Sequence, residues 1–231
     1  MNNFLSLLYK QGKRHSALYL VSLWLMFSSP ASAIDLQCSI AENAQIKPTV
    51  RALMIDAADK GYLYYTDNST SLVTFQVNHF PFSTVNGVFN QFQGGLALPV
   101  ENEQSEQALF VIKADSVFTG DDDLDDYLKS SVFFNVTQFP EIIFVSTGFE
   151  WVDESTARLH GNLTLHGKTR PLVFNMHIDD RENNHVGEGQ RMTMMASAKI
   201  KRSDFGMHEL QIFVSDTVTF NLKIKAFRVR S

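Results

Sequence analysis

The sequence has almost no cysteine, which excludes several kinds of site. Among 231 residues only Cys38 is a cysteine. No disulfide can therefore form within the chain, and no Cys-x-x-Cys motif is present for redox chemistry, zinc or haem attachment. The preceding residues, Asp35-Leu36-Gln37, lack the small side chains expected before a lipidated cysteine. We interpret Cys38 as a free thiol, against the alternatives of a lipid anchor and an intermolecular bridge, so stability must come from a buried core.

Catalytic and metal-binding motifs are also missing. The chain contains no G-x-S-x-G, no S-x-x-K followed by K-T-G, and no H-E-x-x-H. The histidines His160, His166, His177 and His185 do not suggest a metal site, because His160 and His166 lie roughly 20 Å apart if they share one strand face. The sequence thus predicts a protein that is not an enzyme and that has neither a cofactor nor a metal.

Positive charge is in deficit. The chain has 20 Lys and Arg against 25 Asp and Glu, a formal net charge of −5. No basic stripe with interleaved aromatic residues is present, so we expect no binding to nucleic acid. Near the C-terminus, Lys223 and Lys225 alternate with Leu222 and Ile224. We interpret this positive segment as the outer face of an amphipathic strand.

Long apolar runs are confined to the beginning of the chain. A basic start (Lys10, Lys13 and Arg14) precedes an apolar run at 17–27, and small residues follow up to Ala33. At ~1.5 Å per residue the run crosses only about half of a ~30 Å hydrocarbon core. We therefore predict a secretory signal peptide over 1–33 with cleavage near Ala33, the alternative being an uncleaved anchor. Cleavage would take the formal charge from −5 to −8.

What the chain does have is repeated alternation of apolar and polar residues. Val73, Phe75 and Val77 alternate with polar residues, and His79 is the next residue on the same face. Such alternation is typical of strands with one buried face. The further segments with this pattern are 107–115, 156–165, 171–178, 191–200 and 217–229, with Gly94-Gly95 and Asn183-Asn184 as expected turn residues. The sequence therefore predicts an antiparallel β-sandwich or β-barrel.

One helix is expected between the strands. Thr119 and Gly120 lead into the acidic run Asp121–Asp126, and Leu124 and Leu128 supply the apolar positions. Acidic residues are favoured at a helix N-terminus. A calcium site is the alternative, but the run lacks the glycine and the distal glutamate of an EF-hand loop. We therefore interpret the run as the start of a short helix.

A second helix is expected before the strands, at 50–58. Val50, Leu53, Met54 and Ala57 have the spacing of one helix face. Thr49 can cap the start and Gly61 can end the helix. Residues 34–60 therefore form an N-terminal extension with one apolar stripe to bury.

Four segments of the sequence together resemble the YceI-like family of bacterial periplasmic proteins. They are LVTFQVNHFPFSTVNGVFNQFQGGL at 72–96, the block at 116–144, LTLHGKTRPL at 163–172 and IKRSDFGM at 200–207. The resemblance implies an all-β fold for 61–231, an elongated antiparallel lipocalin-like β-barrel of about eight strands with a short helical insertion. It also implies a periplasmic location and the binding of a long apolar molecule inside the barrel.

Two departures from the family pattern are informative. The helical insertion has Asp125-Asp126-Tyr127-Leu128, without the histidine that the family often carries there. The strand near 141–145 has Ile143 and Val145 where the family tends to place polar, outward residues. Both faces of that strand are therefore apolar, and our hypothesis is that the helix at 50–58 packs over the outer face.

With the resemblance in place, the inward rows become the expected wall of a ligand cavity. An eight-stranded barrel can hold one small ligand, and 19 Phe and 8 Met suit an adaptable apolar interior. A solidly filled core is the alternative. The residues predicted to bind the ligand are Phe75, Val77, His79, Phe80, Phe82, Phe92, Leu96, Phe144, Leu163, Leu165, Met194, Arg202, Phe205 and Leu222.

Polar contacts to the ligand are expected from few residues. His79 lies where its strand meets Phe80-Pro81-Phe82, so it can bond the polar end of a ligand or a neighbouring backbone carbonyl. Arg202 can clamp a charged head group or pair with Asp204. The segment 166–171 predicts a tight hairpin turn whose basic residues either serve solubility or meet anionic lipid head groups.

The predicted function is thus that of an exported, periplasmic protein that holds or carries a polyisoprenoid, an isoprenoid quinone or a fatty-acid derivative. The predicted partners are this lipid and possible second copies in a homodimer, with no membrane span after signal cleavage. The alternative is an accessory or interaction protein of a membrane redox or stress system, with a filled core and no bound lipid.

Overall fold

The computed structural model describes residues 61–80, 83–99, 106–179 and 191–229. All of these residues belong to one compact unit. The predicted signal peptide at 1–33, Cys38, the helix at 50–58, Phe82, Asn183-Asn184 and His185 lie outside the described residues.

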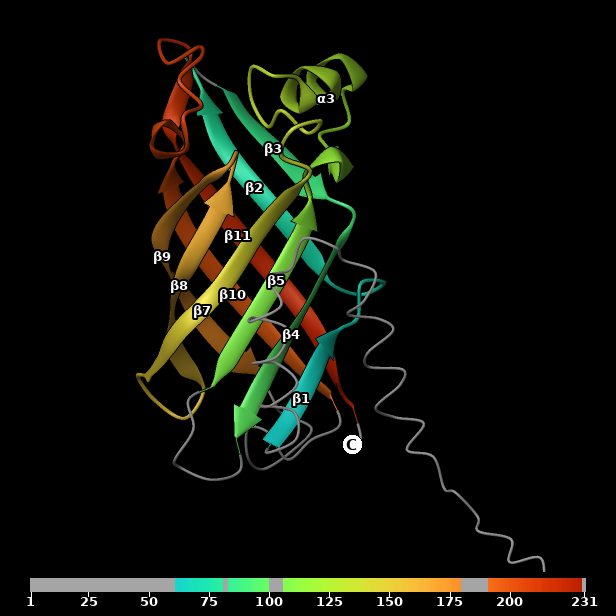
Figure 1. The fold of residues 1–231 in the computed structure, drawn as a ribbon, viewed down its shortest axis with the longest axis vertical. Helices are drawn as coiled ribbons and strands as arrows, with labels where there is room; N and C mark the ends of the chain where they lie inside the picture. The colour runs from blue at the N-terminus through green and yellow to red at the C-terminus, as the bar shows by residue number, and fades with distance from the viewer. Residues whose placement is uncertain (1–60, 81–82, 100–105, 180–190, 230–231) are drawn as a thin grey trace, which may run out of the picture. The chain divides into compact units, whose positions relative to one another are not determined.

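Within the described residues, eleven strand segments form one closed antiparallel barrel (Figure 1). The ring runs β1-β4-β5-β7-β8-β9-β10-β11 and closes through the pairing of β1 with β11. The segments are β1 (Gly61–Thr66), β2 (Leu72–His79), β3 (Ser83–Phe89), β4 (Phe92–Pro99), β5 (Gln107–Lys113), β6 (Val117–Phe118), β7 (Glu141–Trp151), β8 (Thr156–Leu165), β9 (Lys168–Asp179), β10 (Arg191–Lys201) and β11 (Val214–Val229).

Three of the eight positions in the barrel wall are shared by two segments. The long strand β11 pairs with β1 at its C-terminal end and with β2 nearer its start. In the same way β4 pairs with β1 and β5, whereas β3 pairs with β2 and β6. The expected all-β barrel of about eight strands is confirmed. The changes of segment from β1 to β2, from β4 to β3 and from β5 to β6 divide the barrel into two parts with different linings.

The alternation of apolar and polar residues along the strands matches the alternation of buried and exposed side chains in the structure. In β8, Ala157, Leu159 and Leu163 are buried, while Arg158 and Asn162 between them are exposed. Apolar side chains of this row face the barrel interior, where burial stabilises each leucine by about 2 kcal/mol.

Gly94 and Gly95 do not form the expected turn; they lie within β4. Gly94 pairs with Phe110, and a Cβ atom on Gly94 would come within 2.4 Å of the Phe110 ring and 2.6 Å of the Leu109 carbonyl oxygen. Glycine is therefore required here by the close approach of a neighbouring strand and its ring. The turn prediction was wrong because local composition does not reveal such a cross-strand contact.

The hairpin between β8 and β9 is confirmed. His166 and Gly167 form its two-residue loop with φ values of 51° and 70°, as expected for the turns that match strand twist. Pro171 lies within β9, in a stretch where the ladder from β10 has stopped, because β10 pairs with β9 only as far as Asn175. A residue without an N–H is tolerated at such an edge.

The acidic run forms the start of helix α3 (Asp122–Lys129), as predicted. Its N-cap is Asp121, whose carboxylate accepts a hydrogen bond from the Leu124 N–H at 3.1 Å. Asp125 is buried and accepts bonds from the N–H and the hydroxyl of Thr119, both at 2.7 Å. The carboxylates at Asp121 and Asp125 therefore stabilise the helix and the turn before it.

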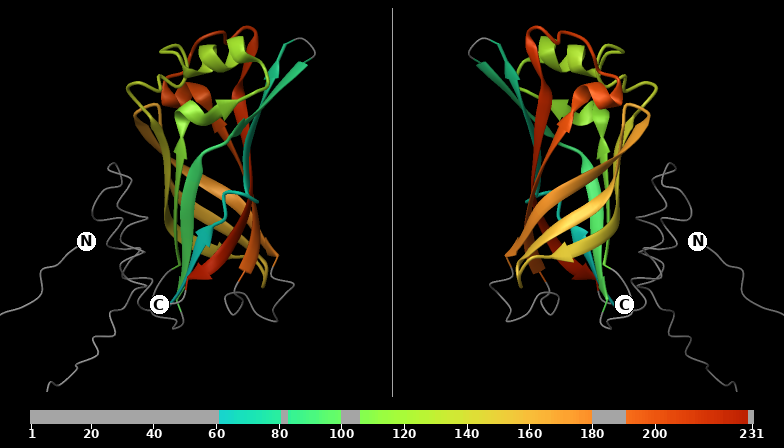
Figure 2. Two further views of the ribbon diagram at one scale, coloured as in Figure 1. Left: turned by 90° about the vertical axis from the view of Figure 1, so that its right-hand side faces the viewer. Right: turned by 90° about the vertical axis from the view of Figure 1, so that its left-hand side faces the viewer.

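Helix α3 and the segment 202–213 lie at the same end of the barrel (Figures 1 and 2). That segment contains the short 3₁₀-helix η2 (Arg202–Phe205); the other one, η1 (Ala114–Ser116), joins β5 to β6. Among the described residues no helix is long and apolar enough to cross a membrane.

A second apolar cluster lies on the outer face of the barrel. It consists of Leu63, Ala97, Leu109 and Val111, with Tyr65, Ile143 and Val145 packed against them. Ile143 and Val145 alternate with Ile142 and Phe144, which face the interior, so the two-faced apolar strand expected at β7 is present. We call this set the outer stripe.

Candidate functional site

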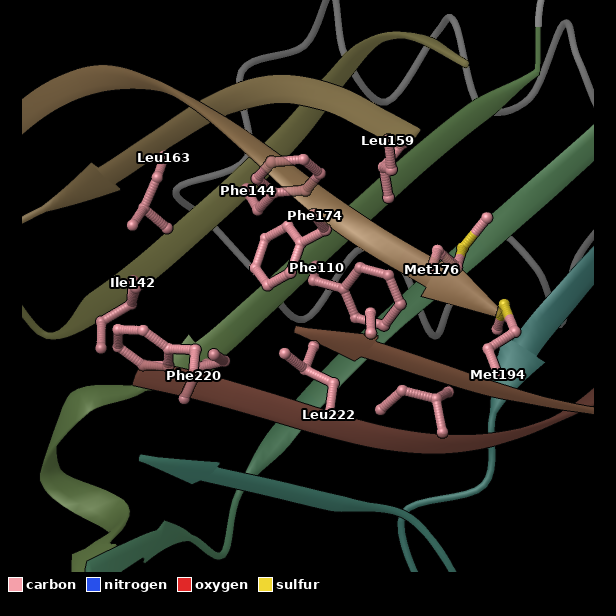
Figure 3. Close-up of a pocket in the computed structure, with 13 residues that line it drawn as sticks. Phe110, Ile142, Phe144, Leu159, Leu163, Phe174, Met176, Met194, Phe220 and Leu222 are labelled. Atoms are coloured by element: carbon pink, nitrogen blue, oxygen red, sulfur yellow. The ribbon is translucent and has the colours of Figure 1, made fainter. Parts of the chain in front are cut away.

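The middle of the barrel encloses a cavity of about 50 Å³ lined entirely by apolar side chains (Figure 3). We call it the barrel cavity. Figure 3 shows side chains from β5, β7, β8, β9, β10 and β11 converging on it. Its lining residues are Phe110, Ile112, Ile142, Phe144, Leu159, Leu163, Phe174, Met176, Met194, Ala196, Phe220, Leu222 and Ile224.

A larger cavity of about 190 Å³ lies under α3, at one end of the barrel. We call it the cap cavity. Its lining residues are Phe75, Val77, His79, Val85, Leu124, Tyr127, Leu128, Phe133, Phe134, Leu165, Ile200, Arg202, Met207, Leu210, Val214, Val218 and Phe220. Most of these are apolar, so the site has few groups that can orient a polar end.

Phe220 of β11 contributes to the lining of both cavities. It is 6% exposed and pairs across the sheet with Phe75 of β2 and Ala198 of β10. The two cavities are therefore neighbours along the barrel, and a rotation of this one side chain would change how they connect.

Glycines allow aromatic rings to lie against the barrel wall. A Cβ atom at Gly87 would come within 2.3 Å of the Phe75 ring, and one at Gly161 within 2.3 Å of the Phe144 ring. Phe144 in turn meets Phe174 edge to face at 5.1 Å between ring centroids. The Phe75 ring in the cap cavity and the Phe144 ring in the barrel cavity can thus occupy their positions only because the facing residue on the neighbouring strand is a glycine.

His79 lies at the rim of the cap cavity. It is exposed, and its Nδ1 lies 3.2 Å from the Ser83 hydroxyl. The apolar row that starts at Val73 therefore ends on a histidine because the strand reaches solvent there. One ring nitrogen, Nε2, remains for a further contact.

Arg202 is only 3% exposed and is held by backbone carbonyls. Its Nε donates to Ser215 at 3.1 Å and its Nη2 to Val214 at 3.0 Å. Its Nη1 donates to Met207 at 2.8 Å and to Glu209 at 2.6 Å. The guanidinium therefore fixes both ends of the segment 207–215, the role of a structural brace.

The charge of Arg202 is buried without a direct ion pair in the described residues. Burial lowers the pKa of Arg202 from its ordinary value, and the negative charges of Asp216 and Glu209 oppose this change. Its guanidinium also lies 6.0 Å from the centroid of the Phe133 ring, a favourable cation–π distance. The cap cavity consequently contains a positive charge in its wall.

Asp216 anchors the other side of η2. Its carboxylate accepts bonds from the Ser203 N–H at 3.0 Å and the Ser203 hydroxyl at 2.8 Å. Burial acts to raise the pKa of Asp216, but the bonds from Ser203 and the charges of Arg202 and Lys201 outweigh it, so the pKa lies below its usual value. Asp204, the partner expected for Arg202, is exposed instead.

The predicted ligand residues separate into four groups in the structure. The barrel cavity is lined by Phe144, Leu163, Met194 and Leu222, and the cap cavity by Phe75, Val77, His79, Leu165 and Arg202. Phe92, Leu96 and Phe205 are buried but line neither cavity, whereas Phe80 is 54% exposed.

Sequence reasoning missed several lining residues. Alternation places Phe110, Phe174 and Phe220 on inward rows, so these could have been found from the pattern. Tyr127 and Leu210 had no such signal, because a helix and a loop bring them to the cavity.

Comparisons with known proteins agree on one family. The model of the YceI-like domain matches residues 64–226. The UPF0312 protein of Yersinia enterocolitica is 31% identical over 162 residues, which cover 69% of this chain and 83% of that protein.

Two solved structures share the fold. Burkholderia cenocepacia BcnA superimposes with a TM-score of 0.61 at 20% identity, covering 69% of this chain and 98% of that one. A polyisoprenoid binding domain from Saccharophagus degradans, implicated in plant cell wall breakdown, gives a TM-score of 0.57 at 15% identity, covering 71% of this chain and 98% of that one.

Proposed function

We propose that this chain, which belongs to the YceI-like domain family, holds one long apolar molecule inside its barrel. The observation that carries the proposal is the cap cavity, an apolar space of about 190 Å³ beside the barrel cavity. The protein would sequester or carry a lipid and would not transform it.

The cavity volumes suggest how such a ligand would fit. An engineered apolar cavity of about 150 Å³ holds benzene, so the cap cavity alone accepts a short part of a hydrocarbon chain. A longer chain requires the barrel cavity to widen, with movement of Phe220, Met176 and Met194. Methionine side chains adapt readily to different shapes. Each buried methylene would then contribute about 0.8 kcal/mol before the costs of association.

The candidate ligands are a polyisoprenoid, an isoprenoid quinone or a fatty-acid derivative. The polyisoprenoid binding domain of similar fold from Saccharophagus degradans supports the first of these. His79 is the candidate for orienting a polar end, since it lies at the rim with one ring nitrogen unused by Ser83. Arg202 would act on a charged head group through its field, because most of its N–H groups already bind carbonyls. The proposed location is the periplasm.

The test is mass spectrometry of lipid that co-purifies with the exported protein, together with displacement of an apolar fluorescent probe. Val77→Trp would fill the cap cavity, since Val77 lines it and pairs with Val85 and Val218, which also line it. Val173→Trp makes the same change on the outer face of β9, where Val173 is 41% exposed. We expect one lipid per chain in wild type and in V173W, and loss of both lipid and probe binding in V77W.

An absence of lipid and of probe binding in the wild-type protein would contradict the proposal. Equal lipid content in V77W and V173W would place the ligand elsewhere. A filled core would then remain, and function would have to lie on the outer surface.

A further inference from the structure

The cap cavity reaches solvent at the end of the barrel that carries α3. Three of its lining residues are exposed: His79, Tyr127 at 38% and Leu210 at 40%. They come from β2, α3 and the segment before β11, so the mouth is bordered by three separate elements.

Large apolar side chains lie on two sides of this mouth, at the end of β2 and in the segment before β11. Ile212 is 85% exposed, Phe213 56% and Phe80 54%. The Phe80 N–H donates to the Phe213 carbonyl at 2.7 Å, which joins the end of β2 to the segment before β11. We call Phe80, Leu210, Ile212 and Phe213 the apolar rim.

The apolar rim is held in place by a fixed backbone. Leu210 has φ of 58°, a left-handed conformation that is unfavourable for a leucine. Its carbonyl accepts bonds from the N–H groups of Phe213 at 2.9 Å and Val214 at 2.8 Å. Arg202 binds the carbonyls of Glu209 and Val214 on either side of this turn. The exposure of Ile212 and Phe213 therefore belongs to a braced turn.

We propose that the apolar rim inserts into the surface of a lipid bilayer, so that the cap cavity opens toward the membrane interior. This inference rests on the proposed function, and it names the surface from which a lipid enters or leaves. A long apolar molecule would then pass between bilayer and cavity without crossing water.

Continuity between rim and cavity favours a bilayer as the occupant. Leu210 belongs to both the apolar rim and the cavity lining, so a single apolar path runs from the exposed tips to the interior. A protein seated on the same residues would close this path, whereas a bilayer supplies the molecules that fit the cavity. Side chains of this kind are typical of proteins that bind at the membrane interface.

Charge near the mouth predicts the lipid preference. Helix α3 exposes Asp122, Asp123 and Asp126 at this end, and Glu209 lies beside the apolar rim. These carboxylates outnumber the basic side chains at the same end, Lys129 in the last turn of α3 and Lys168 beside Gly206. Anionic head groups therefore gain no net attraction, and burial of apolar area must drive insertion. We therefore expect binding to zwitterionic vesicles that anionic lipid does not strengthen.

The experiment is flotation of the protein, recovered from the cell envelope after export, with phosphatidylcholine vesicles. An Ile212→Asp/Phe213→Asp variant is expected to lower the vesicle partition coefficient at least tenfold. Ile212→Trp, which favours the interface, is expected to raise it about threefold. The matched control is Val173→Asp/Met195→Asp, two exposed apolar residues on the outer faces of β9 and β10 that are not near the mouth. The control is expected to bind vesicles as the wild type does.

Apolar-probe binding is measured on the same samples, because it reports the cavity and not the rim. Probe binding that persists in a wild-type protein that does not float would overturn the membrane inference and leave the proposed function intact. If the wild-type protein does not bind the apolar probe, the proposed function is overturned instead. Equal flotation of the rim variant and wild type, or a strong increase with phosphatidylglycerol, would also overturn the inference.

Discussion

At the scale of single residues, Arg202 shows how a buried charge can serve the construction of a site. Four of its N–H groups donate to carbonyls of the segment 207–215. The segment carries Met207, Leu210 and Val214, which line the cap cavity. Arg202 therefore positions several lining residues at once, beyond any direct effect of its charge on a ligand.

We expect Arg202→Met to lower the free energy of unfolding by about 3 kcal/mol, because it leaves several carbonyls without partners. Arg202→Lys keeps the charge but not the planar fork, so its loss should be smaller yet clear. Urea denaturation monitored by tryptophan fluorescence measures both. If R202M were as stable as wild type but no longer bound lipid, Arg202 would be a ligand contact and not a brace.

At the scale of elements, the outer stripe needs an explanation. Leu63 is 3% exposed and Val111 2% exposed, although alternation directs both away from the barrel interior. The first strand that contributes to the stripe, β1, begins at Gly61, shortly after the predicted helix at 50–58. A covering helix with its own apolar stripe would account for the outward apolar side chains of β1, β4, β5 and β7.

Removal of residues 34–60 is therefore expected to lower the melting temperature and the solubility of the exported protein, because the outer stripe would meet water. Two single substitutions distinguish the effect of a helix that covers the outer stripe from the effect of shortening the chain. Leu53→Ser changes the predicted apolar stripe and should cost about 2 kcal/mol, whereas Arg51→Ser on another face should have little effect. Equal stability of the two variants would be evidence against the packing hypothesis.

At the scale of the whole molecule, Phe220 stands between two cavities that together could hold one extended ligand. The division follows from the fold. β11 is long enough to pair with β1 at one end and β2 at the other, so its middle residues face both parts of the barrel.

We expect Phe220→Ala to join the cavities and to cost about 4 kcal/mol of stability. The joined space should bind more probe per chain and retain longer hydrocarbon chains, as mass spectrometry of extracted lipid would show. Phe227→Ala on the same strand is the control; Phe227 is 45% exposed, and its truncation should change stability by less than about 0.5 kcal/mol. If F220A left the bound lipid unchanged in chain length, the ligand would occupy the cap cavity alone.

Local sequence was sufficient for features whose causes are local. The strand at 156–165 and the hairpin at Gly167 could be predicted from alternation and turn chemistry, and α3 from its acidic cap. By contrast, Gly94 gave a wrong turn prediction because its role depends on the Phe110 ring across the sheet. Phe80 lies beyond the end of β2 and is 54% exposed, so its contact with a ligand stays a prediction.

By itself, the alternation determined an antiparallel β-sandwich or β-barrel and most strand positions, because alternation along a strand sets which side chains face inward. The resemblance to the YceI-like family selected the barrel. Only the tertiary structure decided that the interior is divided at Phe220, that the N–H groups of Arg202 bind backbone carbonyls and that an apolar rim borders the mouth. These features depend on contacts between segments far apart in the chain. Such contacts are set by the packing of the whole barrel, which no local pattern encodes.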